Sequence, residues 1–344
     1  MKMIRILNGR TIYYSVKVGL EFMDGIRVFN ISEIGSSHIT TNKGSQDSSN
    51  SYCDKTMAIA IACDGHGGDK YFRSNRGSKF AAEITLKSFK ECMDYENQFI
   101  EKLKENPDKV LGQLEQNIIA NWNSAVVKDF DEDPFNEEEL SKLPNQDRLL
   151  YEQKQGIESA YGTTIIAFLL TEKFCFGLHI GDGKCFAVYE NGEFKQPIPW
   201  DDKCFLNVTT SICDTNAFSN FRNFFSEELP VAVFVGTDGI DDSFATDDQL
   251  QCFYKTVISS FITSSFEIAV RELNLFLPKL SAKGSGDDVS VAAILNLTEI
   301  KRLKDLFVTE TKVTEEIEVS QVELIKKQTI VSIDSDNFLT DKAP

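Results

Sequence analysis

The sequence predicts a mixed fold of β-strands and α-helices (α+β), and two repeating patterns support this. Short apolar runs, some alternating with polar residues, are typical of strands. Longer segments with apolar residues at three- and four-residue spacing are typical of helices that bury one face. Both patterns recur along the 344-residue chain, which is 42% hydrophobic, so we expect a globular protein with a sizeable core.

The strand patterns begin near the N-terminus, where alternating runs flank Asp24-Gly25 and predict strands joined by a turn. Later, Gly181-Asp182-Gly183 reads as a hairpin turn that leads into a returning strand. Asn191-Gly192 is a second hairpin signal. The other predicted strands cover residues 57–63, 162–170, 174–180, 231–235 and 289–295.

Helical spacing is clearest between Leu111 and Val126, and a further helix is predicted after Asp238 with Asp247 as its N-cap. Other helices are expected at about 75–94, 264–280 and 298–307. We therefore divide the chain into N-terminal strands packed on the domain, a main domain with an acidic solvated insertion and a long flap, and a C-terminal helix with a mobile tail. These parts cover residues 1–30, 31–300 (with 129–155 and 196–230 inside it) and 301–344.

The composition excludes several classes of function. Asp and Glu outnumber Lys and Arg by 53 to 36, a net charge of −17, and such a surface repels nucleic acid and anionic membranes. No segment is apolar enough for a signal peptide or a membrane span. The eight cysteines form no Cys-x-x-Cys pair, so we expect reduced thiols in a cytoplasmic protein and no zinc site.

Four aspartates stand at the predicted ends of strands, each beside glycine or in a short turn: Asp64, Asp182, Asp238 and Asp287. Each could simply cap its own turn, which is a common use of aspartate. If they share one rim of stacked sheets, however, they would repel one another unless cations held them. Oxygen ligands suit Mg²⁺ or Mn²⁺, and two such ions can activate a water for attack on phosphorus. His66 could then protonate the leaving oxygen.

Five short motifs, in this order, resemble the metal-dependent Ser/Thr protein phosphatases of the type 2C (PPM) family. They are Asp64-Gly65-His66-Gly67-Gly68, Gly162-Thr163-Thr164, Ile180-Gly181-Asp182, Thr237-Asp238-Gly239 and Gly286-Asp287-Asp288. The match runs from about Gly35 to Leu297, and Ser37-His38 with Gln46-Asp47 is similar to a bacterial subgroup. The resemblance implies two stacked antiparallel β-sheets flanked by helices on both sides.

The resemblance also implies roles for individual residues. Asp64 would bridge two Mn²⁺ or Mg²⁺ ions, and the carbonyl of Gly65 would bind one of them. Asp238 and Asp287 would bind the other ion, while a water that bridges the metals attacks the phosphate. His66 is implied to be the general acid. Two further carboxylates complete the set: Asp47, acting through a metal-bound water, and Asp182, at a third and weaker metal site.

The chain departs from the family at three positions. Gln46 stands where a glutamate is frequent, and Asp288 stands where an asparagine is usual. The arginine that often grips the substrate phosphate is replaced by Asn42. Lys43 and His38 are the candidates for that role, although Lys43 could equally be a solvated loop residue.

The expected function is therefore removal of phosphate from phosphoserine and phosphothreonine in proteins. We expect a phosphorylated protein substrate, an opposing Ser/Thr kinase that acts on the same target, and a monomeric enzyme. Two alternatives stay open on the sequence: a catalytically weak or regulatory module that binds phosphoproteins, and a small-molecule phosphatase. A calcium-binding scaffold is less favoured because no EF-hand spacing occurs.

Overall fold

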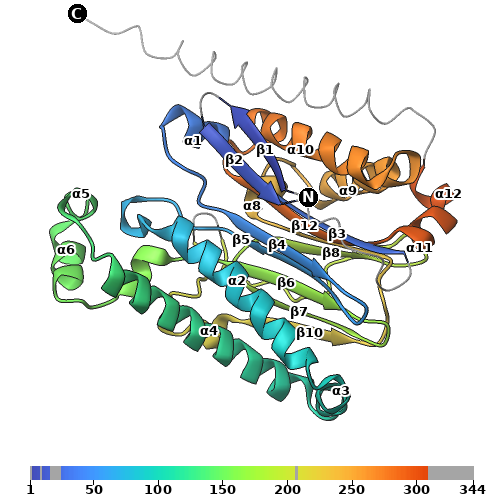
Figure 1. Cartoon of the computed structure of the whole chain (residues 1–344), viewed down its shortest axis with the longest axis horizontal. Coiled ribbons are helices and arrows are strands. Elements are labelled where there is room, and N and C mark those ends of the chain that lie inside the picture. Colours follow the sequence, from blue (N-terminus) through green and yellow to red (C-terminus); the bar gives the residue numbers. More distant parts are fainter. Residues whose placement is uncertain (1, 8–9, 16–24, 206–207, 309–344) are drawn as a thin grey trace, which may run out of the picture.

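The fold is a four-layer sandwich of two antiparallel sheets between two layers of helices (Figure 1). A computed structural model describes residues 25–205 and 208–308 in full, and residues 2–7 and 10–15 at the level of the backbone. The predicted fold class is confirmed. The predicted tail lies outside the described residues from 309 onward.

Each sheet has five strands. The first has the order β10-β7-β6-β5-β4, and the second has the order β3-β12-β11-β8-β9. All neighbouring strands in both sheets are antiparallel. The first sheet consists of β4 (Ser48–Cys53), β5 (Ala58–Cys63), β6 (Ile165–Leu170), β7 (Cys175–Ile180) and β10 (Arg222–Ser226). The second consists of β3 (Ile26–Glu33), β8 (Lys184–Val188), β9 (Phe194–Lys195), β11 (Ala232–Gly236) and β12 (Val289–Asn296).

Long helices cover the outer face of each sheet (Figure 1). The first sheet packs against α2 (Ser74–Met93) and α4 (Pro107–Glu132), with α3 (Glu96–Glu105) at their end. The second packs against α9 (Asp247–Thr263) and α10 (Phe266–Lys283). Short elements fill the connections: α1 (Ser36–Thr40), η1 (Asp69–Tyr71), α5 (Glu137–Leu140), α6 (Asn145–Glu152), η2 (Ile157–Tyr161), α7 (Ala217–Asn220), α8 (Asp238–Asp241), α11 (Leu297–Arg302) and α12 (Lys304–Phe307).

Three apolar layers hold the sandwich together. One lies between the first sheet and α2 and α4, and a second lies between the other sheet and α9 and α10. The third lies between the two sheets and uses small residues such as Ala60 and Ala62, so that the sheets approach closely. Trp122 is fully buried in the first layer, where its indole N–H donates to the Gly77 carbonyl at 3.0 Å.

Most predicted helices are confirmed, with shifted ends. The predicted helices at 75–94, 111–126 and 264–280 correspond to α2, α4 and α10. The predicted N-cap Asp247 is wrong, because the Thr246 hydroxyl accepts the Gln249 N–H and Asp247 is the first residue of α9. Within the described residues, no helix has both the length and the apolar character needed to cross a membrane.

The connections of the structure differ from the predicted ones at four points. Asp182 is not in a hairpin turn, since β7 and β8 belong to different sheets and the chain crosses between the sheets there. The boundary at residue 30 falls inside β3, a strand of the second sheet. The strand β2 (Arg10–Ser15) pairs with β1 (Lys2–Leu7) and not with β3. The stretch 196–230 is not all flap, because it includes the edge strand β10.

The acidic stretch 129–155 is only partly the solvated charge run that the sequence predicts. Glu139 of this stretch forms a bidentate ion pair with Arg73, whose side chain is 2% exposed. Arg73 also donates to the backbone carbonyls of Asp133 and Pro134. Asp129 pairs with Arg76 at 2.9 Å. The acidic residues therefore serve to balance two arginines of the preceding segment, a contact that sequence periodicity cannot reveal.

Candidate active site

Three carboxylates from three separate connections meet at one end of the sandwich. Asp64 follows β5, Asp182 lies in the crossover from β7 to β8, and Asp238 begins α8 just after β11. One oxygen from each lies within 4.8 Å of the others. Because β5 and β7 belong to one sheet and β11 to the other, this group of three aspartates forms only when the two sheets stack.

The three carboxylates disfavour one another's charge. Burial, followed by the charge of Asp47, raises the pKa of Asp64 well above its ordinary value. Burial and then the charges of Asp64 and Asp182 raise the pKa of Asp238 in the same way. Burial also raises the pKa of Asp182, against the effect of a hydrogen bond from Thr209. The group consists entirely of hard oxygen donors, so it fits Mg²⁺ or Mn²⁺, which would remove this repulsion.

Asp47 lies beside this group but is not one of its members. It stands just before β4 and is 9% exposed, and its carboxylate accepts a hydrogen bond from the Thr237 hydroxyl at 2.8 Å. Burial and the charge of Asp288 raise the pKa of Asp47 well above its ordinary value. The indirect role expected for Asp47 stays a prediction.

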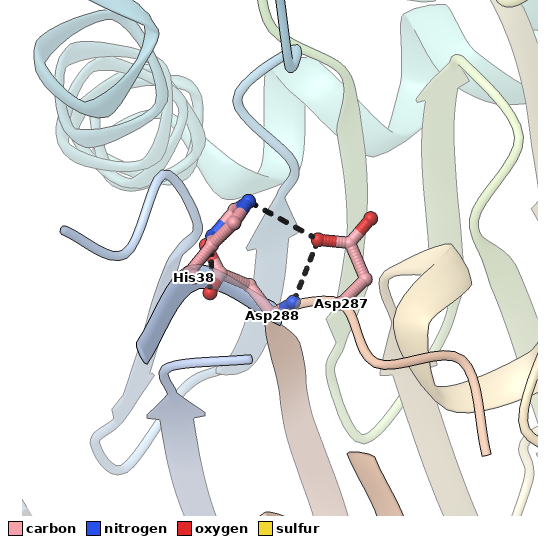
Figure 2. A group of neighbouring side chains, drawn as sticks. All are labelled: His38, Asp287 and Asp288. Atoms are coloured by element: carbon pink, nitrogen blue, oxygen red, sulfur yellow. Dashed lines mark hydrogen bonds and ion pairs between the residues drawn. The ribbon is translucent and has the colours of Figure 1, made fainter. Parts of the chain in front are cut away.

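Asp287 belongs to a second cluster, together with His38 and Asp288 (Figure 2). The side chain of Asp287 is 54% exposed, and its Oδ1 lies 3.8 Å from His38 Nε2. The charge of Asp287 still contributes to the raised pKa of Asp64, so the two clusters are neighbours. The structure thus groups Asp238 with Asp64 and Asp182, and groups Asp287 with His38.

Asp288 anchors the segment 35–46 to the start of β12. It is 2% exposed, and its Oδ1 accepts from the Gly35 N–H at 2.7 Å and bonds to His38 Nδ1 at 2.9 Å. Its Oδ2 accepts from the Gln46 N–H at 2.6 Å. An asparagine has only one acceptor oxygen and could not receive all of these donors. This departure from the family pattern therefore has a structural reason.

Gln46 has a comparable reason. Its amide nitrogen donates to the carbonyl of His66 at 2.9 Å and to the Ser74 hydroxyl at 2.5 Å. A glutamate carboxylate could not donate to that carbonyl. The carbonyl of Gln46 also lies against Gly65, where an added Cβ would come within 2.3 Å of it, so Gly65 is needed for a close approach of two backbones.

The Gly162-Thr163-Thr164 motif holds the backbone of Asp64 in place. The Asp64 N–H donates to the Thr164 hydroxyl at 3.0 Å, and the Asp64 carbonyl accepts from the Thr164 N–H and the Thr163 hydroxyl at 2.8 and 2.6 Å. Sequence reasoning gave these threonines no role. Their place directly before a strand, beside a packing glycine, was the available signal.

His66 is enclosed by neighbouring chain. The residue is 9% exposed, and its backbone N–H donates to the Gly162 carbonyl at 3.1 Å. Its imidazole ring packs edge-on against the ring of Tyr71, with 4.9 Å between the centroids. Burial, and then the charge of Lys70, lowers the pKa of His66 to about 4. The imidazole is therefore neutral at pH 7, with a single ring N–H.

The two candidates for phosphate binding differ in exposure. His38 is held by the two aspartates of its cluster, whereas Lys43 is exposed in the 35–46 segment.

Asp242, which the sequence did not single out, is close enough to Asp182 for its charge to raise the pKa of that carboxyl. It lies four residues after Asp238 on the next turn, and that spacing was the signal that could have found it.

Comparisons with known proteins agree with this architecture. The family model described as protein phosphatase 2C matches residues 34–277. A mutant of a bacterial serine phosphatase superposes with a TM-score of 0.51 and 16% identity, over 78% of this chain and 97% of the other. The serine/threonine phosphatase Stp1 from Staphylococcus aureus gives 0.50 and 15%, over 80% and 97%. No curated protein matches the chain.

Proposed function

This chain belongs to the protein phosphatase 2C family of metal-dependent serine/threonine protein phosphatases, and we propose that its chemistry occurs where Asp64, Asp182 and Asp238 meet. The convergence of these three carboxylates within 4.8 Å carries the proposal. They come from connections that are far apart in sequence. Independent turn caps have no reason to converge at one point of both sheets.

The proposed ligand set follows from this arrangement. Asp64, Asp238, Asp287 and the carbonyl of Gly65 would hold two Mn²⁺ or Mg²⁺ ions, and Asp182 would hold a third, weaker one. When bound, such ions supply an activated water and neutralise charge on the phosphoryl oxygens. The chain's own contribution is to bring the carboxylates together in advance, with Thr163 and Thr164 fixing the backbone of Asp64.

We propose that His66 donates the proton to the leaving oxygen. The ring is buried two residues after Asp64, and only its imidazolium form is acidic enough for this step, because a neutral ring would be left as an imidazolate. Burial disfavours that form in the free protein, so the negative charge of a bound phosphoester must raise the pKa of His66 for the ring to carry its second proton. Lys43 is the better candidate for contact with the substrate phosphate, because it is exposed and free to reach outward. The imidazole of His38, in contrast, is bound to Asp288 and has a positioning role in this proposal.

The substrate is proposed to be a phosphorylated protein, with an opposing Ser/Thr kinase acting on the same target. We also propose a monomeric enzyme that works in the cytoplasm. All eight cysteines are free thiols, and four of them are buried, three within the apolar layers: Cys63, Cys175 and Cys185. Free thiols of this kind are typical of proteins in a reducing compartment.

Hydrolysis of a phosphothreonine peptide and of p-nitrophenyl phosphate tests this proposal, with Mn²⁺, Mg²⁺, Ca²⁺ and EDTA compared. We expect turnover of both substrates with Mn²⁺ or Mg²⁺, and none with EDTA. Turnover of p-nitrophenyl phosphate alone would favour a small-molecule phosphatase. Tight binding of the phosphopeptide without any hydrolysis would favour a regulatory binding module.

A further inference from the structure

The crossover that carries Asp182 is held by a ring of polar contacts that the mechanism does not use. Arg222 on the edge strand β10 forms an ion pair with Asp201, and the two side chains are 13% and 8% exposed. A nearly buried ion pair is costly to desolvate, so its presence calls for a reason. It lies next to Gly181, the residue before Asp182.

The contacts close on Gly181 from both sides. The Gly181 N–H donates to the Thr210 hydroxyl at 3.1 Å, and that hydroxyl donates to Asp201 Oδ2 at 2.9 Å. Arg222 pairs with the same Asp201 and donates from its other terminal nitrogen to the Gly181 carbonyl at 3.1 Å. These hydrogen bonds therefore satisfy both the N–H and the carbonyl of Gly181.

Gly181 itself cannot hold this conformation through local preference. Its φ is +120°, and glycine adopts positive and negative φ about equally well, so the residue alone does not favour this conformation. An added Cβ would meet the Thr164 side chain at 2.5 Å, so the backbone also lies close to the motif that holds Asp64. Contacts from the 201–222 region must therefore fix the direction in which the crossover presents Asp182.

The same region touches the carboxylate of Asp182 directly. Thr209, next to Thr210, hydrogen-bonds the Asp182 side chain. Lys203 also ties the loop to the residues before β10, through a 2.6 Å bond from its ammonium to Asn220. One loop thus reaches both the backbone and the side chain at this corner of the metal centre.

We propose that the ion pair between Asp201 and Arg222 positions Asp182 for the weakest cation site. Arg222 and Asp201 are positioning residues, since neither belongs to the group of three aspartates. The inference rests on the proposed function only in treating Asp182 as a cation ligand. It assigns a role to residues within the stretch 196–230, for which the sequence predicted only a long flap.

Direct Mn²⁺ binding tests the proposal, with free Mn²⁺ followed by electron paramagnetic resonance during titration of the metal-free protein. Arg222→Lys keeps the charge beside Asp201 but loses the rigid fork that also reaches Gly181. We expect the weakest Mn²⁺ site to lose affinity about tenfold, a value typical of residues that orient metal ligands, with the tighter sites unchanged. Arg148→Lys, in an exposed ion pair on α6, is the matched control and should bind as the unaltered protein does.

Two outcomes would overturn the proposal, and they separate it from the proposed function. If Arg222→Lys lowers the melting temperature but leaves the Mn²⁺ isotherm unchanged, while Asp182→Asn weakens the last site, the ion pair is only structural and the metal centre stands. If Asp182→Asn also leaves the isotherm unchanged, Asp182 is not a ligand and that part of the proposed function falls too.

A second variant keeps the test decisive if Arg222→Lys does not fold. Thr210→Val has nearly the same shape but removes the hydroxyl that links Gly181 to Asp201. We expect the same selective loss of the weakest site, of about tenfold. An unchanged isotherm for folded Thr210→Val would contradict the positioning role.

Discussion

At the scale of single residues, the candidate site combines charges that oppose folding when no cation is bound. The raised pKa of Asp64 reflects this opposition, because burial and the charge of Asp47 both disfavour the ionised form of its carboxyl group. Asparagine has nearly the same shape but no charge. Replacing the aspartate should therefore affect stability and activity in opposite directions.

We predict that Asp64→Asn raises the urea midpoint of the metal-free protein and lowers turnover of a phosphothreonine peptide by more than about 100-fold, beyond the usual effect of outer-sphere residues. Urea unfolding in EDTA and steady-state kinetics in Mn²⁺ measure the two effects. Asp94→Asn, at an exposed site after α2, is the control and should change neither by much. A midpoint below that of the unaltered protein would contradict the repulsion argument.

His66→Gln should separate two kinds of substrate. A phosphothreonine ester needs a proton on its leaving oxygen, and a positioned acid typically contributes about 10²–10⁴-fold, whereas p-nitrophenolate leaves without one. We expect a large loss of kcat on the peptide and a small loss on p-nitrophenyl phosphate. Equal losses on both would assign His66 a structural role through its contacts with Gly162 and Tyr71.

The two candidates for phosphate binding should also behave differently. Lys43→Ala removes an exposed charge, so we expect a higher KM with kcat nearly unchanged. His38→Ala removes a hydrogen-bond partner of buried Asp288, so we expect its main effect to be a lower melting temperature. Kinetics and melting curves for both variants decide between these roles. A raised KM for His38→Ala at unaltered stability would reverse the assignment.

At the scale of elements, the acidic stretch is attached to the domain by the buried side chain of Arg73. This arginine bonds to Glu139 and Tyr161 and stacks against Phe135, with 4.8 Å from its guanidinium carbon to the ring centroid. Tyr161 ends η2 and leads directly to Gly162, which accepts the His66 N–H. The stretch therefore supports the active-site region, and its removal would leave Arg73 without its main partner.

We predict that Glu139→Ala destabilises the protein by about 3 kcal/mol, because removing one partner of a buried ion pair strands the other charge. Urea unfolding measures the change. Glu138→Ala alters a neighbouring exposed glutamate and should cost little, which makes it the matched control. Equal stability of the two variants would restore the view of a solvated insertion.

At the scale of the whole molecule, stability should depend on pH through the buried carboxyls. The pKa values of Asp47, Asp64 and Asp238 are raised in the folded state, so the folded protein binds more protons than the unfolded chain above the ordinary pKa of aspartate, about 3.9. Stability of the metal-free protein should therefore fall as pH rises from that value towards the raised pKa values.

We predict that the melting temperature in EDTA falls between pH 5 and pH 8, and that added Mn²⁺ raises it more at pH 8 than at pH 5. The reason is that cations compete with protons for the same oxygens. Differential scanning calorimetry at several pH values, with and without Mn²⁺, measures both trends. A melting temperature in EDTA that rises over this range would show that other groups dominate.

The sequence by itself determined the mixed fold, most strands and helices, and the three aspartates that converge, Asp64, Asp182 and Asp238. These follow from apolar periodicity and from short motifs at strand ends, which are local properties of the chain. Only the tertiary structure decided that β7 and β8 lie in different sheets, that Asp288 receives three donors, and that Arg73 and Arg222 are held by acidic residues. Those contacts join residues far apart in sequence, and nothing in the local pattern of either partner specifies the other.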